Sequence, residues 1–216
     1  MTTLKYYTYP NETNVIPKKA VIFLHGWGSN GQDLISLAPY FEPALGDDVL
    51  YISPDALELC DINPMGFQWF SLNDRDPKVM GAGAQSTFPI VDGFIKEIIE
   101  THAIKPENII LVGFSQGTMT GLNYIVNTSY KLAGMVGLSG AFIETGTTPK
   151  HTIPVTLIHG KQDDVVPFTS MAIASDILSK KGFTVETHAV DNLGHSIDET
   201  VFTHATNFMR DKFIKS

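Results

Sequence analysis

A serine between two glycines follows a run of apolar residues near the middle of the chain. The stretch "IILVGFSQG" places Ser115 between Gly113 and Gly117, and a helix pattern begins at Gln116. The G-x-S-x-G nucleophile elbow needs this strand-to-helix context, because its serine occupies a sharp turn and the glycines let neighbouring segments approach closely. The pattern alone is a weak signal in a chain with 18 glycines. With its context, it predicts that Ser115 is a catalytic nucleophile.

A serine hydroxyl is a poor nucleophile at neutral pH and needs a neighbouring base, which is often a histidine. Of the seven histidines, His195 in "NLGHSID" lies in a glycine-containing loop between a late strand pattern and the last helix pattern. The others lie within helix or strand patterns or near their ends. For His25 and His159, which end apolar runs, a hydrogen-bonded role in the core is the more common one. We therefore predict His195 as the base.

The base needs an acid to orient it, and two adjacent carboxylates follow a late apolar run in "VTLIHGKQDDVVP". An acid from this loop gives the chain order serine, aspartate, histidine, which is the order of α/β-hydrolases. Either Asp163 or Asp164 could serve, since turns after strands also favour aspartate for purely structural reasons.

Two backbone N–H groups are also needed, to hold the oxyanion that forms during acyl transfer. The amide of Gln116, directly after the nucleophile, supplies one in an elbow of this type. The early stretch "LHGWG" follows the first long apolar run and offers the Trp27 amide between Gly26 and Gly28. We predict these two amides as the oxyanion hole.

These residues need a sheet and helices to bring them together. Apolar runs typical of strands buried on both faces occur at residues 20–25, 49–53, 109–113, 133–139 and 155–159. An edge strand is expected at 5–9 and a late strand at 184–190. Helix-length segments occupy residues 33–44, 87–102, 116–126, 169–180 and 198–214. Strands that alternate with helices predict an α/β fold with a mostly parallel central sheet flanked by helices.

One region breaks this alternation. Residues 54–86 carry proline, glycine and aromatic residues without a clear period, and long irregular segments inside compact domains are often functional. The "GAGA" at 81–84 is expected to be a flexible turn. Nothing in the sequence indicates a linker or a repeat, so we expect a single domain over residues 1–216.

Composition excludes several classes of function. A formal charge of -8 and a pI near 5.2 argue against binding to nucleic acid or to anionic lipid headgroups. The lone cysteine, Cys60, is expected to fill space. The N-terminal stretch lacks a signal-peptide pattern and no segment is apolar enough to span a bilayer, so no integral membrane association and a cytoplasmic location are expected. A metal hydrolase built on "NDRD" at 73–76 is remote, because no histidine lies at ligand spacing.

Five stretches together resemble the phospholipase/carboxylesterase family of acyl-protein thioesterases and bacterial carboxylesterases. They are "FLHGWGSNGQDL", "ENIILVGFSQG", "KLAGMVGLSG", "HGKQDDVVP" and "GHS", and the similarity extends from about residue 19 to residue 213. The resemblance implies an α/β-hydrolase fold without a large lid domain and a serine esterase that needs no cofactor. It places the nucleophile at Ser115, the base at His195, the acid at Asp163 and the oxyanion amides at Trp27 and Gln116.

The sequence departs from the pattern of similar enzymes at three positions. Asp164 stands where proline is usual, Ser71 in "QWFS" where aspartate is usual, and Thr118 where glycine is frequent. None of the three belongs to the predicted triad. The departure at Ser71 bears on substrate preference.

The resemblance implies an acyl ester or thioester as substrate, including a lysophospholipid or an acylated protein. The expected acyl-binding residues are apolar: Met65, Phe67, Trp69, Phe70, Phe142, Val166 and Leu193. Trp69 is the strongest candidate, although ordinary core packing is the more common role for any single one of them. An exposed apolar groove would also allow a homodimer. The rival hypotheses are a lysophospholipase and a non-catalytic binding protein on the same fold.

Overall fold

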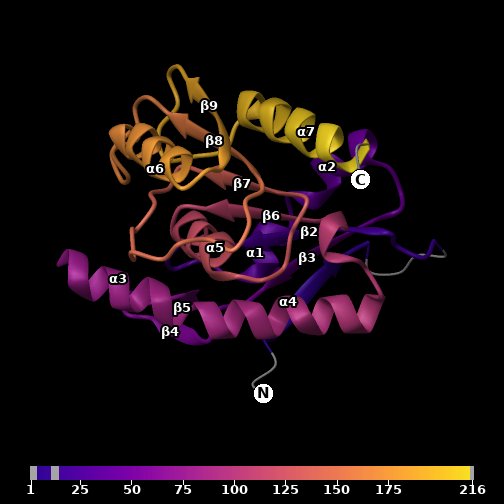
Figure 1. Ribbon diagram of the computed structural model, residues 1–216, viewed down its shortest axis with the longest axis horizontal. Coiled ribbons are helices and arrows are strands. Elements are labelled where there is room, and N and C mark those ends of the chain that lie inside the picture. The colour runs from indigo at the N-terminus through magenta and orange to yellow at the C-terminus, as the bar shows by residue number, and fades with distance from the viewer. Residues whose placement is uncertain (1–3, 11–14, 215–216) are drawn as a thin grey trace.

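A seven-stranded sheet runs through the centre of the computed structural model, which describes residues 4–10 and 15–214 (Figure 1). The strand order is β1-β3-β2-β6-β7-β8-β9, and only β1 pairs antiparallel to its neighbour. The strands are β1 (Tyr6–Tyr9), β2 (Lys19–Leu24), β3 (Val49–Pro54), β6 (Ile109–Phe114), β7 (Gly134–Leu138), β8 (Pro154–Gly160) and β9 (Thr184–Val190). The expected strands are all confirmed within one or two residues.

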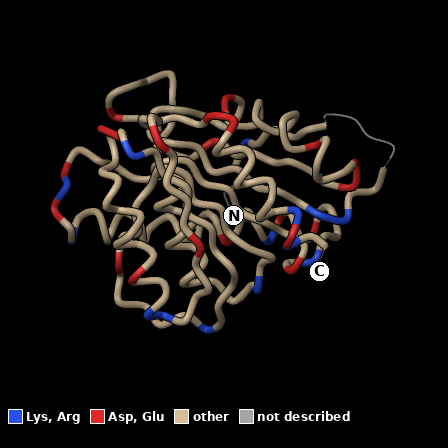
Figure 2. Tube along the Cα trace, turned by 90° about the horizontal axis from the view of Figure 1, so that it is seen from above, with Lys and Arg blue, Asp and Glu red and all other residues tan. Residues whose placement is uncertain are grey.

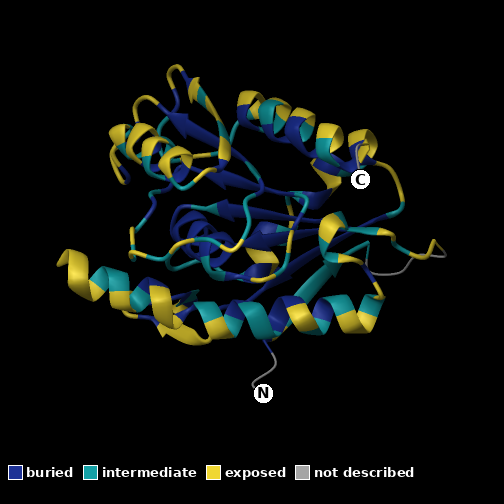
Figure 3. Ribbon diagram, in the orientation of Figure 1, coloured by how far each residue is buried: buried dark blue, intermediate teal, exposed yellow. Residues whose placement is uncertain are grey.

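Both faces of the five inner strands, β3, β2, β6, β7 and β8, are buried, which explains their continuous apolar runs (Figure 3). Along β2, Ile22 and Leu24 point into one core cluster while Val21 and Phe23 point into the other. The helices cover these two faces. On one side lie α1 (Gly31–Ile35), α2 (Ala38–Leu45) and α7 (Glu199–Ile214); on the other lie α3 (Pro77–Ser86), α4 (Phe88–His102), α5 (Gln116–Asn127) and α6 (Thr169–Lys180).

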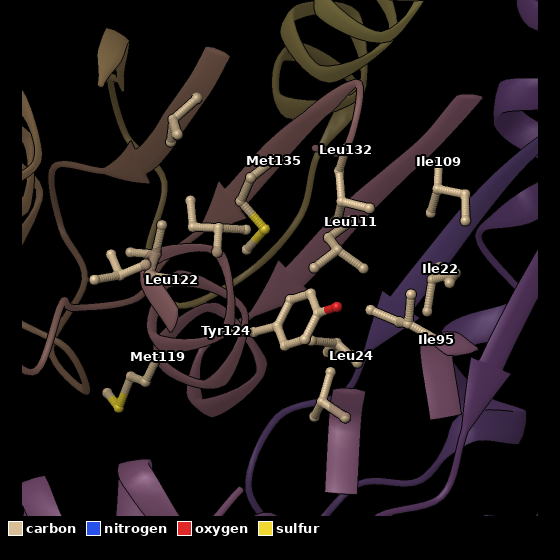
Figure 4. Packing of buried hydrophobic residues seen from close by; sticks show 14 of the residues in the cluster. Ile22, Leu24, Ile95, Ile109, Leu111, Met119, Leu122, Tyr124, Leu132 and Met135 are labelled. Atoms are coloured by element: carbon tan, nitrogen blue, oxygen red, sulfur yellow. The ribbon is translucent and has the colours of Figure 1, made fainter. Parts of the chain in front are cut away.

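Helix α5 is buried along almost its whole length, and several of its side chains belong to the larger core cluster. Tyr124 and Leu122 pack there with Leu111 and Met135 of the sheet (Figure 4). A helix buried on all sides is held rigidly by its neighbours. The start of α5 is therefore a firm base for any group placed there.

Three predictions about local structure are wrong. The segment 33–44 forms two helices, because Ser36 ends α1 and Pro39, which lacks an N–H group, stands in the first turn of α2. The region 54–86 is also more regular than expected, with a hairpin of β4 (Glu58–Cys60) and β5 (Asn63–Gln68) followed by α3. The "GAGA" at 81–84 lies inside α3, which begins where the Asp76 side chain accepts a hydrogen bond from the Lys78 amide at 2.9 Å.

The connection from β7 to β8 contains no helix or strand within the described residues, in agreement with the expected lack of a large lid domain. Cys60 is buried, as predicted. Lysine and arginine residues are scattered among aspartate and glutamate residues along the chain (Figure 2). None of the described helices combines the length and apolar character needed to cross a membrane.

Candidate active site

Ser115 lies on a strained turn between β6 and α5. Its backbone has φ 54° and ψ −115°, a conformation that costs a non-glycine residue on the order of 1–3 kcal/mol. The turn fits because Gly117 has no side chain: a Cβ there would lie 1.8 Å from the Leu24 carbonyl oxygen. The Ser115 amide donates to the Leu138 carbonyl oxygen at 2.9 Å, which fixes the turn against β7. The geometry is that of a nucleophile elbow.

Thr118 ties the elbow to the sheet from inside α5. Its hydroxyl oxygen lies 2.7 Å from the Gly113 carbonyl oxygen and 2.9 Å from that of Leu138, and it accepts the Leu138 amide at 3.0 Å. A glycine here would supply none of these bonds. The departure at Thr118 therefore adds a hydrogen-bonded brace to the turn.

Asp163 and His195 come together in the structure. Nδ1 of His195 lies 2.8 Å from Oδ2 of Asp163, while Oδ1 accepts the backbone amides of Val165 at 3.0 Å and Val166 at 2.9 Å. Burial opposes ionisation of this carboxyl, but the hydrogen bonds from His195 and from the two amides outweigh it and hold the pKa of Asp163 below its usual value. Asp164 is exposed, as expected for a turn residue.

A cavity of about 610 Å³ is lined by both Ser115 and His195. The His195 ring lies against the Phe114 ring, with 4.9 Å between the centroids. Within the described part of the chain, no hydrogen bond joins the Ser115 hydroxyl to the His195 ring. Contacts of this kind often tighten only when substrate is bound.

The backbone N–H groups of Trp27 and Gln116 are available to bind an oxyanion. Among the described residues, neither backbone N–H donates to a protein acceptor, although Gln116 is fully buried. Trp27 lines the cavity together with Ser115. Two unpaired amides beside the Ser115 hydroxyl could stabilise a negative charge that develops there.

Comparison with known proteins agrees with this arrangement. The model of the phospholipase/carboxylesterase family matches residues 11–212. The chain belongs to this family. It is therefore a hydrolase, and the predicted resemblance and fold class are confirmed.

Individual members of the family are similar over much of their length. Acyl-protein thioesterase 1 of Saccharomyces cerevisiae is 32% identical over 165 residues, which cover 69% of this chain and 72% of the relative. Esterase YpfH of Escherichia coli is 26% identical over 200 residues, covering 89% and 82%. The crystal structure of esterase PE8 superposes with a TM-score of 0.90 at 31% identity, covering 97% of this chain and 99% of that one.

Trp69, the strongest acyl-binding candidate from the sequence, occupies a different place. It is 4% exposed and is not among the described residues that line the cavity. Its indole Nε1 donates to the His25 carbonyl oxygen at 2.9 Å, and its backbone amide donates to Oε1 of Gln116 at 3.0 Å. Trp69 thus connects the loop that carries Trp27 to the elbow that carries Ser115.

Of the other six expected acyl-binding residues, the structure places only Val166 in the described lining of the cavity. Met65 is 85% exposed on the β4–β5 hairpin, and Phe67 lies in β5 of that hairpin. The remaining three are buried in the two core clusters: Phe70, Phe142 and Leu193. Aromatic and apolar character alone does not separate a cavity wall from a core.

The apolar part of the cavity wall comes mainly from residues that the sequence did not single out. They are Leu34 and Leu37 beside α1, Leu72 and Met80 around α3, Met119 of α5, Ala141, Val165, Pro167 and Ile197. Arg75 is the one arginine or lysine in the described lining. Their positions in the sequence could have indicated them, since most of these residues lie in loops that follow strands or at the start of α5. In open α/β sheets such loops form the binding crevice.

The remaining departure from the family pattern lies near the hairpin. The Ser71 hydroxyl donates to the Asp61 carboxylate at 2.6 Å on the surface, and Ser71 is absent from the described lining. Ser71 therefore has no contact through which it would select the acyl group directly.

His25 has the core role expected from the sequence. It is fully buried, its Nδ1 lies 2.8 Å from the Gly26 carbonyl oxygen, and its Nε2 accepts the Ala56 amide at 3.0 Å. Burial lowers the pKa of His25, which suits a ring that must stay neutral to accept at Nε2.

Proposed function

We propose that the protein is a serine carboxylesterase that hydrolyses acyl esters or thioesters through a covalent acyl-enzyme. The observation that carries this proposal is the pairing of a strained serine elbow with a hydrogen-bonded Asp163–His195 pair around one cavity. Membership of a hydrolase family supports it.

His195 can act as the base because Asp163 fixes which ring nitrogen carries the hydrogen. With Asp163 ionised, Nδ1 carries the hydrogen that bonds to Oδ2, so Nε2 keeps its lone pair. As Ser115 Oγ bonds to the substrate carbonyl carbon, the hydroxyl proton passes to Nε2 and the carbonyl electrons move to oxygen. The Asp163 carboxylate stabilises the imidazolium that results.

The oxyanion is held by the amides of Trp27 and Gln116. When the tetrahedral intermediate collapses, the bond to the leaving group breaks and His195 gives its proton to the departing alkoxide or thiolate, which leaves as the alcohol or thiol. Water then attacks the acyl-enzyme, loses its proton to His195, and Ser115 is released as the hydroxyl. The acyl chain leaves as the free acid.

The cavity wall indicates an apolar acyl group, because apolar side chains make up most of its described lining. A second cavity of about 860 Å³, lined in part by α7, lies next to the first, since Ser36, Leu37 and Ile197 line both. This space allows a leaving group larger than a simple alcohol. Lysophospholipids and acylated proteins both belong to this substrate class.

A fluorophosphonate probe tests the proposal. Wild-type protein should be labelled, Ser115→Ala should not, and Ser179→Ala, an exposed serine on α6, should be labelled like wild type. Labelling that persists in Ser115→Ala would identify a different nucleophile. No labelling of wild type would favour a non-catalytic binding protein. A panel of esters and thioesters of increasing acyl length then reports the fit of the cavity, and indifference to length would argue against an acyl site there.

A further inference from the structure

A second histidine lies against the carboxylate that orients the predicted base. His159 is the penultimate residue of β8 and is 1% exposed. Its Nε2 lies 3.1 Å from Oδ2 of Asp163, the same oxygen that receives His195 Nδ1 at 2.8 Å. Its ring also meets the Phe168 ring edge-on, with 6.0 Å between the centroids. The ring therefore has a fixed place in the core.

The neighbours of Nε2 determine where the His159 hydrogen is. The Val166 carbonyl oxygen lies 3.0 Å from Nε2, and the Asp163 oxygen lies 3.1 Å from it. Both are acceptors when Asp163 is ionised, and a lone pair at Nε2 would be repelled by both. Nε2 must therefore carry the hydrogen, which is donated to the Val166 carbonyl oxygen and lies close to the carboxylate.

Val166 is held from both sides by this arrangement. Its amide donates to Oδ1 of Asp163 at 2.9 Å, and its carbonyl oxygen accepts from His159 at 3.0 Å. Val166 also lines the cavity that contains Ser115. The buried Nε2–H group of His159 thus holds Val166, which in turn donates to the Asp163 carboxylate and lines the cavity.

We propose that His159 is a positioning residue that fixes the Asp163 carboxylate and the Val166 backbone for catalysis. This inference rests on the proposed function, because it assigns Asp163 the role of triad acid. His159 touches no substrate and acts through the two residues that it holds. Asp163 is the one titratable group with a recorded contact to His159 in the described residues.

The role predicts a specific change in pH dependence. The His195 Nδ1–H group donates to Oδ2, and the Nε2 atom of His159, whose hydrogen is bonded to Val166, lies 3.1 Å from the same oxygen, so both N–H dipoles place positive charge beside it. Without His159, the carboxylate interacts more strongly with the protonated His195 ring. The acid limb of the pH dependence of kcat/KM should then move to higher pH.

Two substitutions and a control separate positioning from ordinary core packing. His159→Leu removes the N–H group, whereas His159→Gln keeps a donor that can reach the Val166 carbonyl oxygen. Val155→Ala, a buried residue of the same strand without contact to Asp163, should lower the melting temperature alone.

We expect His159→Leu to lose about tenfold in kcat/KM, as is typical when a hydrogen-bonding residue that orients a functional group is removed, and to shift the acid limb by up to about one pH unit. His159→Gln should keep the wild-type limb. The inference is wrong if His159→Leu keeps the wild-type limb, or if its loss of activity only follows its loss of stability, as in Val155→Ala.

A second measurement does not depend on activity. Histidine-ring ¹H–¹⁵N NMR of the wild-type protein should show His159 with its hydrogen on Nε2, and a ring with hydrogen on Nδ1 alone would overturn the inference. If the wild-type protein hydrolyses no ester, the proposed function fails while the NMR result still decides the geometry at His159.

Discussion

Asp163→Asn is the substitution that discriminates most sharply between the two adjacent carboxylates. The Asp163 carboxylate accepts His195 Nδ1 at 2.8 Å on one oxygen and the amides of Val165 and Val166 at 3.0 and 2.9 Å on the other. An asparagine side chain keeps one acceptor oxygen and gains an NH₂ group that can only donate. The two backbone amides claim the oxygen, because they cannot accept.

The NH₂ group then faces His195 and forces Nδ1 to become the acceptor. The ring hydrogen moves to Nε2, the atom that has to take the Ser115 proton. Neutralising a triad acid in this way lowers kcat about 10⁴-fold, which at 1.36 kcal/mol for each factor of ten is about 5.4 kcal/mol of transition-state stabilisation. The fold should survive, because the two backbone amides keep their acceptor.

Steady-state hydrolysis of a chromogenic butyrate ester measures this loss, and a melting curve shows that the variant is folded. Asp164→Asn is the matched control, because Asp164 is adjacent but exposed. It should stay within about twofold of wild type, as surface substitutions usually do. A loss below tenfold for Asp163→Asn, or a larger loss for Asp164→Asn, would refute the assignment of the acid.

Three further predictions concern the surroundings of the site. Trp69→Phe leaves the buried His25 carbonyl oxygen without its 2.9 Å donor, so the free energy of unfolding measured with denaturant should fall by about 1–3 kcal/mol. The substitution should also lower kcat more than it changes KM. An unchanged kcat would show that this contact does not position the Trp27 loop. Because burial lowers the pKa of His25, the unfolded chain takes up a proton below about pH 6.5 that the folded chain does not. The free energy of unfolding should therefore fall as pH drops from about 6.5, and His25→Gln should show a smaller fall. Parallel curves of unfolding free energy against pH for the wild type and His25→Gln would contradict this prediction. Arg75→Gln should lower kcat/KM for an ester whose acyl chain ends in a carboxylate and spare a neutral ester of the same length, since Arg75 is the one arginine or lysine in the described lining. An unchanged ratio of kcat/KM for the two esters would rule out an electrostatic role for Arg75.

Much of the fold could be predicted from the sequence, because strands buried on both faces leave a plain signal. The run "AVIFLH" is apolar throughout, since Ile22 and Phe23 face opposite cores. Helix α3 was missed because the glycines of "GAGA" are typical of turns. Its cap at Asp76 and the proline at its start were the better guide.

The site was harder to predict, since it depends on contacts between distant segments. The elbow and the loops that carry Asp163 and His195 follow from local patterns, whereas Trp69 looked like an acyl-binding residue. Its place is decided by a hydrogen bond to a carbonyl 44 residues away in the chain. The bond between His159 and Val166 likewise depends on how the loop after β8 folds back on its strand. The homodimer, the cytoplasmic location and the single domain stay predictions.

The central claim is that Ser115 becomes acylated during turnover. Wild-type protein mixed with a p-nitrophenyl ester and quenched in acid within milliseconds should gain the mass of one acyl group, and peptide mapping should locate that group on Ser115. His195→Ala should accumulate no such adduct on the same timescale. An adduct on another residue, or turnover of the ester without any adduct at Ser115 under single-turnover conditions, would contradict the account.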